Sequence, residues 1–515
     1  MMDWTDGYVQ ELDYTHSHHA ALAPGLMDLA CASRGVVSPL DGRPLKYLEL
    51  AFGQGVSLNI HAAAFPGEYW GIDFNPVHAA NARELASASG AGARIIDASL
   101  EEFAARDDLP EFDVIAMHGT WSWISARNRH FVVEILRRRL APGGLAYLSY
   151  NCWPGWAAEM PLRHLLAEHV AKSGSGGTLS ARIDRALEFA RAMADANALF
   201  FKAYPKLKDV LAQMAAQNRH YVAHEYFNLD WHPMPSAEVA EALSAAKLVF
   251  AASATLADHL DTENSFPSAG ALLAGVSDPA LRETARDYLT NRRFRRDIFV
   301  KGLRTVAPAQ RHARLRGMAF SLLQHPDHVP SKITVAAGEA TLHPEIYRPF
   351  IESMASDGYA PKTLEQAAKH PKCAKLTPAQ VAQAAVMLVG AGSLHPVQPS
   401  SAVEIAAPRC KALNALILER ATRSDNVSAL ASPVTGAGVF AVRQEMLFLR
   451  ALARGQMTPD LWAAHAWDCL KANDERLLQD GKALEGEAEH LTRLRSGAEA
   501  FARVRLPVLK ALRVA

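Results

Sequence analysis

Residues 47–60 read YLELAFGQGVSLNI, and this stretch decides the fold of the first half of the chain. It begins as a short apolar run that contains Glu49, and it continues into a turn with two glycines, Gly53 and Gly55. Glycine lets a backbone turn sharply and approach a ligand closely. A helix that starts at such a turn presents its free N–H groups to the same place. The stretch therefore predicts a strand, a ligand-binding turn and a helix.

Strand-like and helix-like segments alternate from residue 46 to residue 151. The expected strands are the runs KYLELAF, EYWGIDF, ARIIDAS, FDVIAMHG and GLAYLSYN. This alternation predicts an α/β fold with a Rossmann-like, doubly wound parallel sheet that binds its ligand at the carboxyl ends of the strands. Further along, AEVAEALSAAKLVFAASATL adds one helix and one strand, and FRRDIFVKG at residues 294–302 adds an antiparallel last strand.

The rest of the chain divides into segments of different character. We expect a catalytic core in residues 1–156 and 221–303, separated by a helical insertion at 157–220 that serves as a lid or in dimerisation. Residues 304–400 contain the expected strands MAFSLL and KITVAAGEATL and three helix-like segments, an order that suggests a winged-helix-like middle region. Residues 401–515 are rich in Ala and Leu and predict a mainly helical regulatory or interaction region.

Composition limits the function classes. Lys plus Arg and Asp plus Glu both number 54, so the chain lacks the overall positive charge of a dedicated nucleic-acid-binding protein. Its 5 cysteines form no CxxC pair, which indicates reduced thiols in a cytoplasmic protein. The acidic amino terminus is unlike a secretory signal, and the longest apolar run, residues 381–394, is too short to cross a bilayer. We expect no membrane insertion.

The glycine turn does not match a dinucleotide site. The third glycine of such a fingerprint would lie where the chain has Leu58, which disfavours the alternative of a nucleotide-dependent oxidoreductase. Asp73 and Asp97 end the next two predicted strands, and Glu49, Asp73 and Asp97 are each separated by 24 residues. One acid alone is an ordinary strand-end residue. The ordered set instead indicates an adenosyl cofactor without phosphates, with Asp73 at the ribose and Asp97 at the adenine amine.

These motifs resemble those of a known family. The runs LELAFGQG, GIDFNP, IIDASLEEF and LAPGGLAYLSYN are similar to successive motifs of class I S-adenosylmethionine-dependent methyltransferases. The runs DYTHSHHAALAP, HGTWSWIS, YNCWPGW and YVAHEYFN resemble the members with a methyltransferase regulatory domain, which include rickettsial outer-membrane-protein lysine methyltransferases. The resemblance covers roughly the first 300 residues and, more loosely, the remainder. It departs from the usual motif at Ala51, which replaces a glycine, and in the histidine-rich run THSHH.

The resemblance implies S-adenosylmethionine as cofactor, a homodimer, and N-methylation with protein lysine as a candidate acceptor. A small-molecule methyltransferase and a non-catalytic S-adenosylmethionine-binding regulatory protein stay open as alternatives. The expected cofactor-binding residues are Glu49, Ala51, Phe52, Gly53, Gln54, Gly55, Asp73, Phe74, Asn75, Asp97, Ala98, His118 and Trp121.

Three residues are candidates for catalysis: His118, Tyr14 and Asn151. His118 follows the fourth predicted strand, where it can accept a proton from an acceptor amine or position its lone pair. The alternative for His118 is a structural histidine under a loop. Tyr14 would come from a lid-like amino-terminal segment and Asn151 from the end of the fifth strand. The fourth strand lacks an Asn/Asp-Pro-Pro-Tyr motif, which disfavours methylation of adenine N6 or of glutamine.

Two histidine groups raise the question of a metal site. His220 and His224 lie four residues apart, a spacing that can bind zinc, but the resemblance favours a substrate lid there. His16, His18 and His19 lack an acidic or cysteine partner at a ligand spacing, so we interpret them as an exposed polar cluster. We predict no metal.

Overall fold

The computed structural model describes residues 15–40, 43–173, 176–228, 230–259, 267–335, 338–479 and 482–515. Its centre is a seven-stranded sheet in the order β3-β2-β1-β4-β5-β7-β6. The strands are β1 (Leu45–Leu50), β2 (Gly67–Asp73), β3 (Arg94–Asp97), β4 (Phe112–Met117), β5 (Leu140–Asn151), β6 (Leu248–Ser253) and β7 (Phe294–Lys301). The first five run parallel, and β7 is antiparallel to both β5 and β6. The predicted doubly wound sheet and its antiparallel last strand are confirmed.

Both faces of the sheet are buried, because side chains alternate between them along each strand. Tyr47 and Tyr69 lie on the face covered by α1 (Pro24–Arg34), α2 (Val56–Ala64) and α3 (Pro76–Ser89). Leu48 and Trp70 lie on the opposite face, under α4 (Leu100–Ala105), α5 (Ala126–Arg139) and α11 (Ser236–Ser244). Full burial of a leucine side chain such as Leu48 stabilises the fold by about 1.5–3 kcal/mol.

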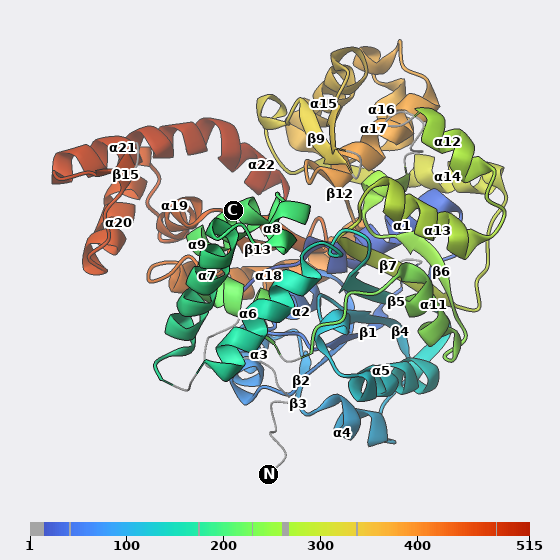
Figure 1. The fold of residues 1–515 in the computed structure, drawn as a ribbon. Coiled ribbons are helices and arrows are strands. Elements are labelled where there is room, and N and C mark those ends of the chain that lie inside the picture. The colour runs from blue at the N-terminus through green and yellow to red at the C-terminus, as the bar shows by residue number, and fades with distance from the viewer. Residues whose placement is uncertain are drawn as a thin grey trace.

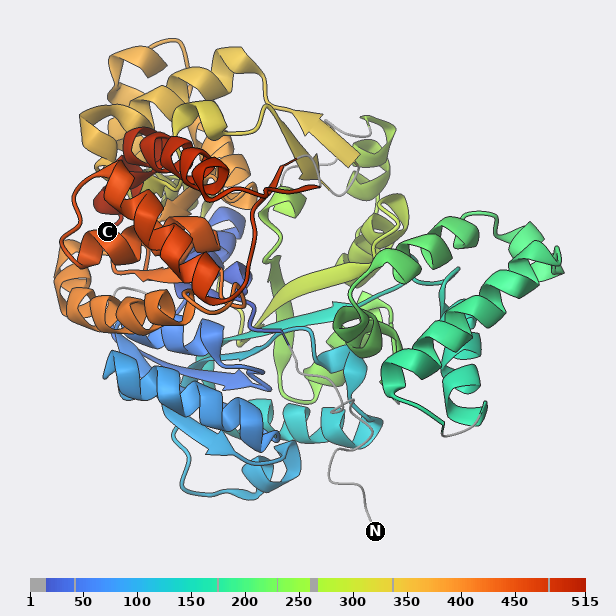
Figure 2. The same ribbon diagram turned by 90° about the vertical axis from the view of Figure 1, so that its left-hand side faces the viewer.

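The helical insertion follows β5 and has its own core. It consists of α6 (Met160–Lys172), α7 (Leu179–Asp195), α8 (Leu199–Ala203), α9 (Leu207–Ala216) and α10 (Arg219–Tyr226). The predicted apolar face of α7, Ile183, Leu187 and Ala190, is buried against the neighbouring helices. Figure 2 shows these helices projecting on one side of the molecule, opposite the orange and red helices of the carboxyl-terminal part.

A small layer of strands and helices follows the sheet. Its strands are β8 (Ala319–Leu322), β9 (Lys332–Val335), β10 (Gly338–Thr341), β11 (Lys362–Thr363) and β12 (Leu394–Pro396). Its helices, preceded by α12 (Pro267–Ala274) and α13 (Pro279–Leu289), are α14 (Pro308–Gly317), α15 (Pro344–Tyr359), α16 (Leu364–Lys369) and α17 (Pro378–Gly390). The strands and the three helices expected there are present, and β8 pairs with β11 and β12. The winged-helix assignment and the domain boundaries stay predictions.

The carboxyl-terminal region covers α2, the helix that follows the glycine turn. It contains α18 (Ser400–Arg420), α19 (Arg443–Ala453), α20 (Pro459–Ala472), α21 (Glu487–Ala500) and α22 (Leu506–Ala511), with the hairpins β13 (Ala429–Ser432)–β14 (Ala437–Phe440) and β15 (Leu478–Gln479)–β16 (Lys482–Ala483). Every residue of α2 is buried, because the sheet lies on one side of it and α18 packs on the other (Figure 1). In the described residues, no helix is both long and apolar enough to span a bilayer.

Candidate cofactor and acceptor site

The turn between β1 and α2 has an unusual backbone. Ala51, Gly53 and Gly55 all have positive φ, at 54°, 59° and 71°. Non-glycine residues rarely adopt this left-handed region, so the alanine that replaces the usual first glycine sits there at a cost. A Cβ on Gly55 would lie 2.5 Å from Cβ of Ala82 in α3. Gly55 thus permits the close approach of the turn to α3.

We expect Gly55→Ala to lower the free energy of unfolding by at least about 2 kcal/mol, because a left-handed alanine costs about 1–2 kcal/mol and overpacking adds about 1–3 kcal/mol. Denaturant unfolding measures the loss. Gly90→Ala is the matched control, since Gly90 also has a positive φ of 62° but nothing within 4 Å of its Cβ position. Equal losses in both variants would show that α3 yields to the extra methyl group.

Asp73, at the carboxyl end of β2, holds the turn together. Its Oδ2 accepts the N–H of Gly53 at 2.8 Å, and its Oδ1 accepts the N–H of Asn75 at 3.0 Å. Nδ1 of the buried His78 lies 3.1 Å from the same Oδ1. A carboxylate has about four acceptor positions, so three internal contacts leave about one for a ligand hydroxyl. Asn75 then caps α3 by accepting the N–H of Val77 at 2.9 Å.

Glu49 is a buried acid beneath the turn. Its side chain is 3% exposed, and in the described part of the chain its Oε2 has no hydrogen-bond partner. Burial, and then the neighbouring charge of Asp73, raise the pKa of Glu49 to about 8. An unsatisfied buried oxygen calls for a donor from outside the chain. Glu49 therefore fits a ligand that brings a cationic or N–H group to this turn.

His118 follows β4 and lies beside β5. Its Nδ1 is 2.9 Å from the hydroxyl of Tyr147 and 3.1 Å from the Oγ of Ser149. That Oγ also accepts the N–H of Gly119 at 2.7 Å, so the loop after β4 is tied to β5. Burial is the main cause that lowers the pKa of His118 well below its usual value, and His19 and Arg296 lower it further. His118 is consequently a neutral imidazole held in one orientation.

The amino-terminal segment supplies a second imidazole. The ring of His19 stacks on that of His118 with 4.1 Å between ring centroids, and its backbone N–H donates to Oγ of Ser57 in α2 at 2.8 Å. Burial lowers the pKa of His19 to about 4. His18 packs against His61, with its Nε2 enclosed. The interpretation of His18 and His19 as part of an exposed polar cluster is therefore wrong.

The predicted site residues do not all converge. Ala51, Phe52, Gln54, Asn75 and Ala98 surround the ends of β1, β2 and β3, and Ala98 N–H donates to the carbonyl of Asp73 at 3.1 Å. Phe74 follows Asp73, and Asp97 is exposed at the end of β3.

Trp121 and Asn151 are deeply buried, at 1% and 4% exposure. The indole N–H of Trp121 donates to the sulfur of Met234 at 3.2 Å, which turns this ring toward the core. The backbone N–H of Asn151 donates to Oγ of Ser122 at 2.8 Å. Tyr14 lies outside the described residues, as does the side chain of His220. His224 is buried, and among the side chains described no group of three His, Cys, Asp or Glu is arranged to hold a metal ion.

Sequence reasoning missed Tyr147, Ser149, His19 and Arg296. Tyr147 and Ser149 alternate along β5 and so share a face of the sheet, a signal that could have linked them to the strand end near His118. His19 and Arg296 come from segments about 100 and 180 residues away from His118 in the chain, and no local pattern pairs them with it.

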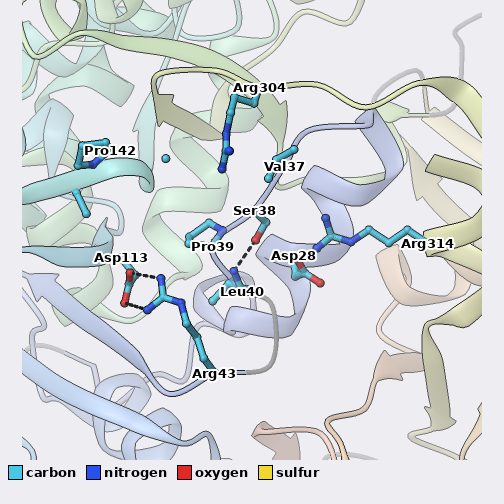
Figure 3. Close-up of a pocket in the computed structure, with 12 residues that line it drawn as sticks. Asp28, Val37, Ser38, Pro39, Leu40, Arg43, Asp113, Pro142, Arg304 and Arg314 are labelled. Atoms are coloured by element: carbon cyan, nitrogen blue, oxygen red, sulfur yellow. Dashed lines mark hydrogen bonds and ion pairs between the residues drawn. The ribbon is translucent and has the colours of Figure 1, made fainter. Parts of the chain in front are cut away.

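A cavity of about 590 Å³ lies at the opposite ends of the strands, where β4 and β5 begin. Figure 3 shows Arg43 paired there with Asp113, the second residue of β4, at 2.7 Å. Arg304 and the Asp28–Arg314 ion pair also line it. In parallel α/β sheets ligands bind beyond the carboxyl ends of the strands. This cavity, at the amino ends, is therefore separate from the site built by Asp73 and His118.

Comparisons with known proteins agree with this geometry. Residues 48–144 match the model of a methyltransferase domain, and residues 218–301 match that of a predicted methyltransferase regulatory domain. A protein of Synechocystis sp., sll1526, is 36% identical over 99% of both chains. A protein of Rickettsia prowazekii is 26% identical over 55% of this chain and 51% of its own. The structure of PKMT2 from Rickettsia typhi in complex with AdoHcy superimposes with a TM-score of 0.69 at 16% identity, over 97% of this chain and 99% of that one.

The sheet order, the left-handed turn after β1 and the acid at the end of β2 define a class I methyltransferase fold. The chain belongs to the S-adenosylmethionine-dependent methyltransferases that carry a methyltransferase regulatory domain. The protein is thus an enzyme, and its cofactor is S-adenosylmethionine.

Proposed function

We propose that the enzyme methylates nitrogen, and that its acceptor is the side-chain amine of a protein lysine. The observation that carries the proposal is the likeness to PKMT2 over nearly the whole length of both chains, accessory regions included. The motifs shared with rickettsial lysine methyltransferases support the same acceptor.

The chemistry of the pocket suits an amine that must lose its proton before it reacts. Bound S-adenosylmethionine supplies an activated methyl group on a sulfonium. Burial and the positive charge of Arg296 both lower the pKa of His19 and His118. The same two effects favour the neutral form of a lysine amine placed beside these rings. In this proposal His118, fixed by Tyr147 and Ser149, orients the neutral amine for in-line attack.

The acceptor is tested by incubating the enzyme with tritiated S-adenosylmethionine and a cell lysate, then separating protein, nucleic acid and small molecules. We expect the label in protein, and methyl-lysine after acid hydrolysis. Label confined to small molecules would contradict the proposal and favour a small-molecule methyltransferase. Enzyme carrying Asp73→Asn is the control for label that does not depend on the bound cofactor.

We expect His118→Gln to lower kcat by about 100-fold, the usual scale for a positioned group that assists proton movement or orientation. Binding of S-adenosylhomocysteine should change little. Because the pKa of His118 lies well below its usual value of 6.5, its protonation should not produce a break near pH 6.5 in the wild-type pH profile of kcat/KM. Tyr147→Phe, which keeps the ring but loses one hydroxyl contact, should give a smaller loss. Unchanged kcat in His118→Gln would remove the residue from the mechanism.

A further inference from the structure

A chain of hydrogen bonds connects the cofactor turn to the carboxyl-terminal region. The carbonyl of Gln54, inside the turn, accepts from Nδ2 of Asn81 in α3 at 2.7 Å. Oδ1 of Asn81 accepts from Nη1 of Arg420 at 2.9 Å. Arg420 is the last residue of α18, 339 residues beyond Asn81 in the sequence. The turn is therefore held by a residue from outside the catalytic sheet.

The orientation of the Asn81 amide follows from what its two neighbours can do. A guanidinium only donates hydrogen bonds and a carbonyl only accepts them. With Arg420 on one side, Oδ1 must face the guanidinium, and Nδ2 is left to donate to Gln54. Without Arg420 the carbonyl of Gln54 still prefers Nδ2, but Oδ1 loses its charged donor, so the Asn81 side chain is held at one end only.

Arg420 also forms an ion pair with Glu84 of α3, at 2.7 Å from Nη2. The side chain of Glu84 is 60% exposed, whereas that of Arg420 is 24% exposed. An exposed pair of this kind contributes about 0–1 kcal/mol. The two contacts of Arg420 can thus be removed separately: one docks α18 on α3, and the other orients Asn81.

We infer that Arg420 is a positioning residue for the cofactor turn, so that the carboxyl-terminal region sets part of the affinity for S-adenosylmethionine through Asn81 and Gln54. The inference concerns the cofactor site alone and is independent of the identity of the methyl acceptor.

We call the hydrogen-bonded chain from Arg420 through Asn81 to Gln54 the relay. Calorimetric titration of the full-length enzyme with S-adenosylhomocysteine tests it. We expect Arg420→Ala to raise Kd about tenfold and Arg420→Lys, which still offers a donor, to restore binding to within about threefold. Asn81→Asp can still pair with Arg420 but cannot donate to Gln54, and it should also raise Kd about tenfold. In steady-state assays the KM for S-adenosylmethionine should rise, while kcat and the KM for the acceptor stay unchanged.

Two matched controls distinguish the relay from simple docking of α18. Glu84→Gln breaks the ion pair and keeps the relay. Arg423→Ala removes an arginine that lines the same small cavity as Asn81 and Arg420. Both should bind S-adenosylhomocysteine within twofold of wild type. The inference is overturned if Glu84→Gln weakens binding as much as Arg420→Ala, or if Asn81→Asp binds normally. If Arg420→Ala does not fold, the affinity of Asn81→Asp for S-adenosylhomocysteine tests the inference instead, because this variant retains the contact with Arg420.

Discussion

Asp73→Asn is expected to weaken binding of S-adenosylhomocysteine by about 100-fold, which corresponds to about 2.8 kcal/mol. The substitution keeps the shape of the side chain but replaces one acceptor oxygen with an NH₂ donor. In the folded enzyme both oxygens accept backbone N–H groups, from Gly53 and from Asn75. One of these N–H groups would then face another donor, and hydrogen bonds to a charged acceptor contribute about 1.5–3 kcal/mol each. The turn then loses the two backbone contacts that fix its shape, and the ribose contact expected of Asp73 would be weakened as well.

Asp97→Asn is the matched control for this effect. Asp97 also ends a strand of the parallel sheet, but its side chain is exposed, so we expect no more than about tenfold weaker binding. Calorimetry with both variants, together with their melting temperatures, separates loss of the contact from unfolding. Binding of S-adenosylhomocysteine to Asp73→Asn within threefold of wild type would refute the role assigned to Asp73.

Acidification is expected to destabilise the protein steeply below pH 6.5, because the neutral, half-buried His18 lies with two buried neutral histidines, His61 and His395. Burial lowers the pKa of His18 to about 3 and of His395 to about 4, and it lowers the pKa of His61 well below its usual value. Four of their ring nitrogens have no hydrogen-bond partner within the described ranges: His18 Nε2, both nitrogens of His61, and His395 Nε2. Protonation of any of these rings would bury an uncompensated charge.

The sign of the effect follows from proton binding in the two states. Unfolded histidine has a pKa of about 6.5. As the pH falls below that value the unfolded chain takes up protons that the folded chain excludes, until the pH reaches the lowered folded pKa. Each histidine then removes about 1.4 kcal/mol of unfolding free energy per pH unit. Three such groups together remove about 4 kcal/mol per unit, a large part of the total stability of a typical protein.

The measurement is the melting temperature by calorimetry between pH 7.5 and 4.5, in wild type and in His61→Leu. The unfolded variant takes up one proton fewer than the unfolded wild type, so its free energy of unfolding should depend less steeply on pH. His164→Leu is the control, because the side chain of His164 is 74% exposed and its loss should leave the slope unchanged. Identical slopes in wild type and His61→Leu would show that His61 is not part of the linkage.

The alternation of strand and helix signals predicts the doubly wound sheet correctly because both periodicities are local properties of the chain. The glycine turn and Asp73 follow for the same reason: a positive φ calls for a small residue, and a strand end is visible in the hydrophobic pattern. The exposed interpretation fails for His18 and His19 because a run of polar residues does not reveal which segment will cover it. The contact of the Trp121 ring with Met234, more than 100 residues away, is likewise one that no local pattern reveals.

By itself the sequence determined the parallel sheet, located the turn at YLELAFGQG and the strand-end acid Asp73, and indicated the adenosyl cofactor. Only the tertiary structure brought His19 onto His118, enclosed α2 beneath α18, and connected Arg420 to Gln54 through Asn81. The first group depends on neighbours within one strand-turn-helix unit. The second depends on contacts between segments hundreds of residues apart, which form only when packing of the whole chain places those surfaces together.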